Sequence, residues 1–297
     1  MLICLGGIHG NEPAGVIAID LILKMLEVEP ITNPDFEFHG SLVGIRGNLQ
    51  ALAKKQRFIE RDLNRSLRVD EVNELLSKDP DTLYAEDKEV VELVRCIRTE
   101  IERVNPPSVI VLDLHTTTAF GGIFVLTADN EESIRVGVSM NAPVITGFEG
   151  LLAGTTMGYF RADQFDGLAM TTVVFESGQH DEPLSVNRAI AATINCMETI
   201  GCVKAEDVEN RHNHLLVEYS EGLPRVSRIL SRYHVENLAA FEMMPDFKNF
   251  DRVASGDVLA YENGEPVTAG QEALIIMPKY QKQGVDGFFL VEAVEGY

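Results

Sequence analysis

Short apolar runs alternate with longer amphipathic segments from Met1 to Gly201. Runs rich in β-branched residues predict strands, and apolar residues spaced three or four positions apart predict helices. The predicted strands are Met1–Leu5, Phe36–Val43, Ser108–Leu114, Gly122–Leu126 and Met170–Phe175. The predicted helices are Pro13–Leu26, Ala85–Val104 and Ser185–Ile200. This alternation indicates an α/β fold with a largely parallel or mixed central sheet flanked by helices, and such sheets bind ligands at the carboxyl ends of their strands.

The pattern changes after Gly201, where short segments are separated by glycine and proline. Gly256–Ala260 and Glu262–Pro266 are examples. Such spacing is typical of a small β-rich unit. We therefore expect a larger α/β domain over residues 1–203 and a smaller C-terminal β-rich domain over residues 204–297.

Composition adds that the protein is globular and strongly acidic. Its 297 residues are 45% hydrophobic, and 46 acidic against 25 basic side chains give a formal charge of −21. This charge repels phosphate backbones and anionic bilayers, so neither nucleic acid nor a membrane is an expected partner. A carboxylate-bearing ligand would need a local cluster of basic side chains.

The four cysteines lie far apart or within apolar runs, without the spacing of a metal motif or a disulfide framework. They are Cys4, Cys96, Cys196 and Cys202. We expect buried free thiols and a cytoplasmic location. Met1–Gly7 lacks the basic stretch of a leader, and no apolar run reaches the roughly 18 residues that a membrane helix needs.

Three residues have the side chains and positions of metal ligands. His9 and Glu12 lie three positions apart where the first predicted strand turns into a helix, so both can face one point. His115 ends the apolar strand Ser108–Leu114, and Asp113 would lie on the same strand face, able to orient its imidazole. Two imidazoles and a carboxylate leave a fourth position for water in a catalytic zinc site. The alternative for His115 is a buried histidine with ordinary hydrogen bonds.

Two further segments carry polar residues suited to hydrolysis. Three arginines and an asparagine fall within Arg57–Arg65, and arginine binds carboxylates through two parallel hydrogen bonds. Glu176 ends the apolar run Met170–Phe175, where a carboxylate can accept a proton from an attacking water and return it to a leaving amine. The alternatives are a surface cluster of ion pairs for the arginines and a structural ion pair for the glutamate.

In their order along the chain, these motifs resemble the aspartoacylase and succinylglutamate desuccinylase family of the zinc carboxypeptidase superfamily. The motifs are HxxE at His9, RxxxxDxNR at Arg57, DLHT at Asp113 and ExG at Glu176. The resemblance covers roughly residues 1 to 180, and Phe241 to Leu259 also resembles the desuccinylase C-terminal domain. It implies deacylation of a small acidic N-acyl amino acid on a zinc-carboxypeptidase-like fold.

The resemblance also implies a role for each matching residue. His9, Glu12 and His115 would hold one zinc ion per chain. Arg57 would polarise the scissile carbonyl, and Glu176 would act as the general base. Asn64 and Arg65 would bind the α-carboxylate of the substrate.

The sequence departs from the family in the pocket for an acidic side chain, where aspartoacylases use a further arginine and a C-terminal tyrosine. Arg161 is the nearest arginine upstream of Glu176, but its spacing does not match. Phe288-Phe289 stand about where the tyrosine would be, and Tyr280 is another candidate for that position. The acyl group and the amino acid therefore stay open.

Other functions are less well supported by the motifs. A carboxypeptidase-like enzyme or another N-acyl amino acid amidohydrolase would use the same set of residues. A metal-binding pseudoenzyme with a partner or sensor role would lack an essential residue, and all are present. Gly6-Gly7 is not followed by a phosphate-binding motif, which disfavours nucleotide binding. A homo-oligomer is compatible with everything above.

Overall fold

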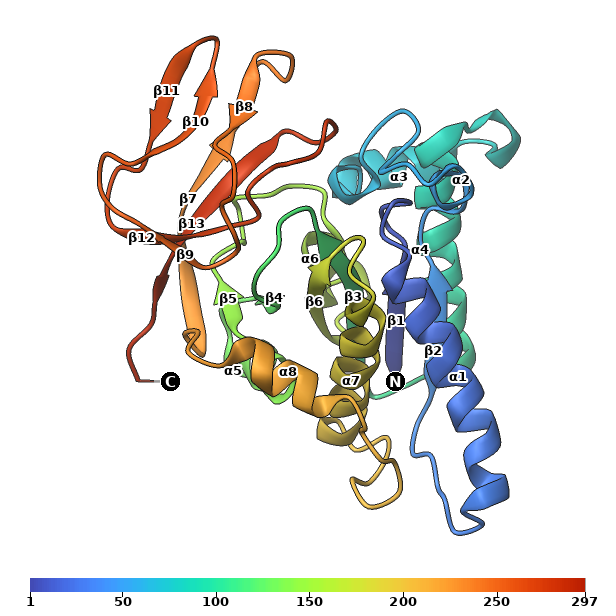
Figure 1. The fold of residues 1–297 in the computed structure, drawn as a ribbon. Coiled ribbons are helices and arrows are strands. Elements are labelled where there is room, and N and C mark those ends of the chain that lie inside the picture. The colour runs from blue at the N-terminus through green and yellow to red at the C-terminus, as the bar shows by residue number, and fades with distance from the viewer. Residues whose placement is uncertain (297) are drawn as a thin grey trace.

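The computed structural model describes residues 1–296, which contain a ten-stranded and a three-stranded sheet (Figure 1). The strand order of the large sheet is β2-β1-β3-β6-β4-β5-β7-β13-β12-β9, and that of the small sheet is β11-β10-β8. The strands are β1 (Leu2–Gly6), β2 (Leu42–Arg46), β3 (Ser108–Thr117), β4 (Phe124–Thr127), β5 (Val144–Thr146), β6 (Ala169–Gln179), β7 (Val226–His234), β8 (Phe241–Met243), β9 (Asp251–Val253), β10 (Val258–Glu262), β11 (Glu265–Thr268), β12 (Ala273–Ile276) and β13 (Asp286–Ala293).

The large sheet is mixed. Strands β2, β1, β3 and β6 are parallel neighbours, β4 is antiparallel to β6, and β5 is parallel to both β4 and β7. From β7 onward the pairing with β13, β12 and β9 is antiparallel. The carboxyl ends of β1, β3 and β6 therefore meet at one edge, where side chains from distant parts of the sequence come together.

Helices cover both faces of the parallel part of the sheet (Figure 1). Their bounds are α1 (Ala14–Thr32), α2 (Leu49–Lys54), α3 (Val69–Ser77), α4 (Ala85–Val104), α5 (Glu131–Ser139), α6 (Thr156–Tyr159), α7 (Leu184–Thr199) and α8 (Asn213–Ser220), with the short 3-10 turns η1 (Leu63–Arg65), η2 (Pro80–Thr82) and η3 (Ala162–Gln164).

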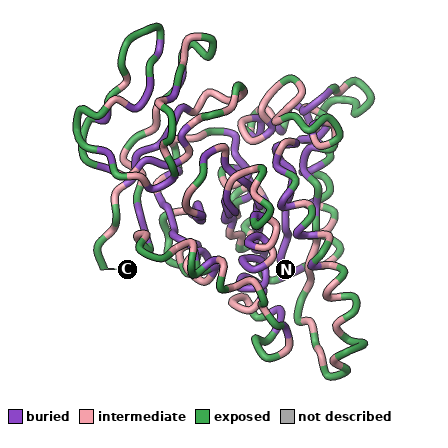
Figure 2. The backbone as a smooth tube through the Cα atoms, in the orientation of Figure 1, coloured by how far each residue is buried: buried purple, intermediate pink, exposed green. Residues whose placement is uncertain are grey.

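Alternation along β1 shows why the sheet needs a layer on each face. Leu2 and Cys4 pack in one hydrophobic cluster with α1 and α7, whereas Ile3 and Leu5 pack in another with α3 and α4. Successive strand residues point to opposite faces, so a strand covered on both sides reads as a continuous apolar run. Figure 2 shows the buried backbone gathered along these central strands.

The expected fold class, a mixed α/β sheet with helices and a β-rich C-terminal part, is confirmed. The division at residues 203 and 204 stays a prediction, because hydrogen bonding continues across the sheet from β5 to β7. Strands β8, β10 and β11 form the small sheet, whose apolar side chains share one hydrophobic cluster with those of β9, β12 and β13.

Most predicted elements are confirmed, and Ala85–Val104 is a helix with those bounds. The strand predicted over Phe36–Val43 is wrong, because the strand there is β2 (Leu42–Arg46). Phe36 and Phe38 pack against the core from an irregular segment, so their apolar pattern reflects burial without strand pairing.

The predicted state of the thiols is confirmed in part. All four cysteines are free in the part of the chain that the structure describes, but Cys96 is exposed on α4. In the same range, no helix combines the length and the apolar character that crossing a bilayer requires.

Candidate metal centre and active-site pocket

His9 and Glu12 lie on the tight loop between β1 and α1, and His115 lies near the end of β3. Gly6 of β1 is the register partner of Leu114 on β3, which brings the loop next to His115. The loop packs so closely on α2 that a Cβ at Gly10 would lie 2.0 Å from the carbonyl carbon of Ala51. Close backbone approach therefore requires glycine in the middle of this loop.

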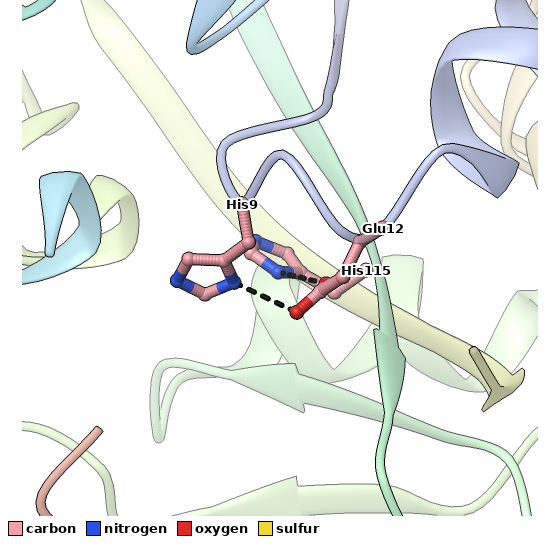
Figure 3. Close-up of side chains that lie close together, drawn as sticks. All are labelled: His9, Glu12 and His115. Carbon is pink, nitrogen blue, oxygen red and sulfur yellow. Dashed lines mark hydrogen bonds and ion pairs between the residues drawn. The ribbon is translucent and has the colours of Figure 1, made fainter. Parts of the chain in front are cut away.

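The three predicted ligands converge, as Figure 3 shows. One ligand atom from each of His9, Glu12 and His115 lies within 4.8 Å of the others, and all three side chains are buried. His9 Nδ1 is 2.9 Å from Glu12 Oε1, and His115 Nδ1 is 3.0 Å from Glu12 Oε2. The Thr116 amide donates a hydrogen bond to the same Oε2 at 3.0 Å. Within residues 1–296, this is the one group of His, Cys, Asp or Glu that meets the geometric requirement for a metal.

Each of the two imidazoles has a second carboxylate at its other nitrogen. His9 Nε2 is 3.1 Å from Asp62 Oδ1, and His115 Nε2 is 2.9 Å from Asp113 Oδ2. A carboxylate at Nε2 favours the tautomer with its proton there, which leaves the Nδ1 lone pair directed at Glu12. Two lone pairs and a carboxylate then face one another, and a cation satisfies all three. The residues therefore fit a divalent metal ion.

Electrostatics at the centre follow from this crowding. Burial alone would raise the pKa of Glu12, but His9 and His115 hold it well below its usual value. Burial would likewise lower the pKa of His115, but Asp113 and Glu12 raise it well above the usual value. Without a metal, a proton on the His115 imidazole supplies positive charge to the carboxylates around it.

Asp62 is the residue whose position sequence reasoning missed. It belongs to the RxxxxDxNR motif, yet the motif gave no sign that its carboxylate reaches His9. Its Oδ2 accepts two hydrogen bonds from Arg57, from Nε at 3.1 Å and from a terminal nitrogen at 2.9 Å. Burial favours a raised pKa for Asp62, but Arg57 and His9 hold that pKa well below its usual value.

Arg57 is buried beside the three candidate ligands. Its side chain is 12% exposed, and one terminal nitrogen lies 3.5 Å from Glu12 Oε1. Burial would lower its pKa, but Asp62 and Glu12 raise it. The structure thus brings a permanently charged guanidinium to the edge of the candidate metal centre.

Asn64 and Arg65 lie on η1, also at the pocket. Asn64 Oδ1 accepts a hydrogen bond from the Thr156 amide at 2.9 Å. Arg65 forms an ion pair with Asp286 on β13, and Arg232 Nε also donates to Asp286, at 2.6 Å. A residue from the C-terminal part of the chain therefore holds the guanidinium of Arg65 in the pocket.

Glu176 on β6 is the register neighbour of His115 on β3. Its carboxyl group is buried, and burial raises its pKa to about 8. Nearby, Thr116 Oγ1 is 2.7 Å from His180 Nδ1, and the Nε2 of that ring has no partner among the described residues. His180 is a second pocket residue that the sequence did not single out.

Arg161 is the predicted site residue that the structure does not bring to the pocket. Its side chain is 56% exposed, and its guanidinium pairs with Asp163 at 2.7 Å. Tyr280 is also exposed, and its hydroxyl donates to Met244 O at 2.9 Å. Phe288 is buried and stacks on Tyr233, so its neighbour Phe289 lines the pocket instead.

All the other predicted site residues line one pocket of about 940 Å³, a volume that includes its open mouth. The pocket is also lined by Thr116, Leu126, Phe148, Leu152, Thr156, Met157, Val174, His180, Met277, Lys279, Gln281, Asp286 and Phe289. It is built jointly by the carboxyl ends of the parallel strands and by residues after Met277.

Residues 1–147 match the family model of the Succinylglutamate desuccinylase/Aspartoacylase catalytic domain. The matched range includes His9, Glu12, Arg57 and His115, whose motifs resemble those of the same family. A probable aspartoacylase of Nostoc sp. is 32% identical over 127 residues, and one of Prochlorococcus marinus is 33% identical over 122 residues. The aligned parts are 42% and 41% of this chain and only 38% and 35% of those relatives.

Solved structures are similar over nearly the whole chain. A succinylglutamate desuccinylase from Vibrio parahaemolyticus has a TM-score of 0.64 at 17% identity, covering 98% of this chain and 80% of that one. Murine aminoacylase 3 has a TM-score of 0.59 at 18% identity, covering 98% and 93%. At such identities the likeness establishes a shared fold, which extends through the β-rich C-terminal part.

Proposed function

We propose that this protein is a zinc-dependent hydrolase that cleaves the amide bond of a small N-acyl amino acid with a free α-carboxylate. One observation carries the proposal: His9, Glu12 and His115 converge in a pocket that also holds the buried carboxyl group of Glu176. The family model that residues 1–147 match and the names of the relatives support the same class of reaction, the deacylation of N-acyl amino acids.

His9, Glu12 and His115 would hold the ion, since two imidazoles and a carboxylate form a common ligand set for catalytic zinc. When bound, zinc lowers the pKa of water toward neutrality and polarises a carbonyl oxygen. Asp62 and Asp113 would fix the orientation of the two rings through Nε2. Nitrogen and oxygen ligands also suit other divalent ions, so metal identity is part of the test.

Glu176 would transfer the proton. Its buried carboxyl group is the register neighbour of His115, and a carboxylate placed beside a metal ligand can carry a proton between an attacking water and a leaving amine. In the proposed reaction, the carboxylate accepts a proton from the attacking water as the C–O bond forms. It then delivers that proton to the amine nitrogen as the C–N bond breaks, so the amine leaves neutral.

Arg57 and Arg65 would have different tasks. Arg57 lies beside the metal ligands, where its charge would stabilise the negative charge that develops on the carbonyl oxygen. Arg65 and Asn64 would bind the α-carboxylate, for which Arg65 exchanges or shares its present partner Asp286. A local guanidinium is needed because the chain as a whole carries a charge of −21.

The test is a hydrolysis screen with zinc-loaded protein and N-acetyl, N-succinyl and N-formyl amino acids, in which released amine is measured. We expect turnover that depends on added metal and falls by about 100-fold or more in Glu176→Gln, because the proton-transfer group is lost. Glu198→Gln is the matched control, since burial also raises the pKa of Glu198 but it does not line the pocket.

Three outcomes would contradict the proposal. Turnover of C-terminal peptide bonds in preference to N-acyl amino acids would identify a carboxypeptidase-like enzyme. Binding without turnover of any substrate would favour a partner or sensor role. Equal rates for wild type and Glu176→Gln would remove the proposed base.

A further inference from the structure

The pocket has an apolar wall that the proposed chemistry does not use. Its members belong to one hydrophobic cluster formed between β4, β5, β6 and the C-terminal strands. They are Leu126, Phe148, Leu152, Met157, Val174, Met277 and Phe289. Polar substrates gain nothing from contact with such a wall, whereas an apolar group buried there leaves water.

Part of this wall is fixed to the residues proposed to bind the α-carboxylate. The segment from Phe148 to Met157 runs past Asn64, whose side-chain oxygen accepts from the Thr156 amide at 2.9 Å. The same segment touches the backbone of Arg65 so closely that a Cβ at Gly154 would lie 2.3 Å from its carbonyl oxygen. The segment that carries Phe148, Leu152 and Met157 therefore adjoins the residues proposed to bind the α-carboxylate.

The cationic side chains of the pocket already have hydrogen-bonding partners within the protein. Arg57 pairs with Asp62, and Arg65 pairs with Asp286. The Lys279 ammonium donates to the backbone carbonyl of Gln281. Arg161, the candidate reader of an acidic side chain, is on the surface. A second carboxylate placed against the wall would lose its hydration. Among the described residues, Lys279 is the one lysine or arginine of the pocket without a carboxylate partner, so it is the cation that such a group would have to reach.

We propose that Phe148, Leu152 and Met157 form a subsite for an apolar side chain, aliphatic or aromatic, of the N-acyl amino acid. This inference rests on the proposed function and specifies its substrate class. The substrate is then acidic only through its α-carboxylate. Each methylene group buried in the subsite should raise kcat/KM about fourfold.

The experiment compares the zinc-loaded wild type on the leucine, methionine, phenylalanine, aspartate and glutamate members of each N-acyl series. Because the acyl group and the α-carboxylate are constant within a series, kcat/KM reports the side chain alone. We expect the apolar members to exceed aspartate by about 100-fold, since an unpaired carboxylate is costly to bury. Lys279→Met should leave this ratio above tenfold, because the lysine is not needed to recognise an apolar group.

Three variants test whether Leu152 contributes to the preference for apolar side chains. Leu152→Arg puts a cation on the wall, and the leucine-to-aspartate ratio should fall at least tenfold. Leu151→Arg is the matched control, because Leu151 is similarly half-buried in the same segment but does not line the pocket. Its ratio should stay that of the wild type. Thermal unfolding checks that each variant is folded, and Leu152→Ala, which needs no new charge, should also lower the ratio.

The possible results separate the two claims. If aspartate or glutamate is the best member of a series, or if Lys279→Met abolishes turnover of the acidic members, the subsite proposal is wrong while the hydrolase proposal stands. The subsite is equally refuted if Leu152→Ala and Leu151→Arg change the ratio alike. If no member of any series is hydrolysed, the proposed function fails and the subsite falls with it.

Discussion

Replacing Asp62 by asparagine should weaken the candidate metal centre without touching any of its three ligands. The Asp62 side chain is only 11% exposed. Its one carboxylate contacts His9 Nε2 and accepts hydrogen bonds from Arg57 and from the backbone amide of Asn64. Asparagine keeps the shape but offers a single acceptor oxygen. If the asparagine oxygen faces Arg57, the amino group faces the N–H groups of His9 and Asn64, and donors oppose donors. If the side-chain amide is flipped, the amino group opposes the N–H groups of Arg57 instead.

The magnitude follows from the burial of these groups. Breaking one side of a buried ion pair costs about 3 to 5 kcal/mol, and we expect the lower end because Arg57 keeps its contact with Glu12 at 3.5 Å. Loss of the carboxylate that orients a ligand imidazole weakens metal affinity by about 10- to 100-fold. Urea unfolding of the metal-free protein measures the first effect, and competition with a chelator measures the zinc dissociation constant.

The matched control is Asp163→Asn. Asp163 pairs with Arg161 through the same two guanidinium nitrogens, Nε at 3.2 Å and a terminal nitrogen at 2.7 Å, but both side chains are more than half exposed. Solvent screens this pair, so neither stability nor zinc affinity should change. If Asp62→Asn bound zinc as tightly as the wild type and unfolded at the same urea concentration, the orienting role of Asp62 would be refuted.

Three further predictions follow from the same contacts. His115→Ala should lose tightly bound zinc by metal analysis, and a full retained equivalent would exclude His115 as a ligand. Arg65→Lys should raise KM for substrates with a free α-carboxylate but not for their amides, whereas Arg57→Ala should mainly lower kcat; equal losses on both substrates would show that Arg65 has another role. Arg188 lowers the pKa of Glu182 through hydrogen bonds, so that carboxylate stabilises the fold above the unfolded glutamate pKa of about 4.3 and stops doing so as the pH falls further. Glu182→Gln should therefore lower the Tm at pH 7, with a deficit that shrinks below about pH 4, and a deficit independent of pH would contradict this.

The candidate ligands could be found from sequence because the signals for them are local. His9 and Glu12 share one loop, and Asp113 and His115 share one strand face, so spacing alone placed each pair correctly. The meeting of the two pairs was inferable from two apolar strands that end in ligand-type residues. Parallel pairing of β1 with β3 then brings those ends together.

The remaining parts of the site depend on contacts that have no local pattern. Asp62 reaches His9 from 53 positions away, and Asp286 reaches Arg65 from 221 positions away. Phe289 lines the pocket, whereas its neighbour Phe288 stacks on Tyr233. Successive strand residues point to opposite faces, so a shift of one residue decides which side chain points into the pocket. The strand expected over Phe36–Val43 failed for a related reason, since aromatic burial resembled strand alternation.

The pairing of β5 with β7, and the placement of Met277, Asp286 and Phe289 in the pocket wall, set an order of events during biosynthesis. The candidate metal ligands are synthesised early, but Arg65 can form its ion pair only after Asp286 has been synthesised. At about 5 to 20 residues per second, the roughly one hundred residues from Glu176 to Asp286 take about 5 to 20 seconds to synthesise. Until β7 has been synthesised, β5 has an unpaired edge in the nascent chain, and the apolar wall is completed only when Met277 and Phe289 follow.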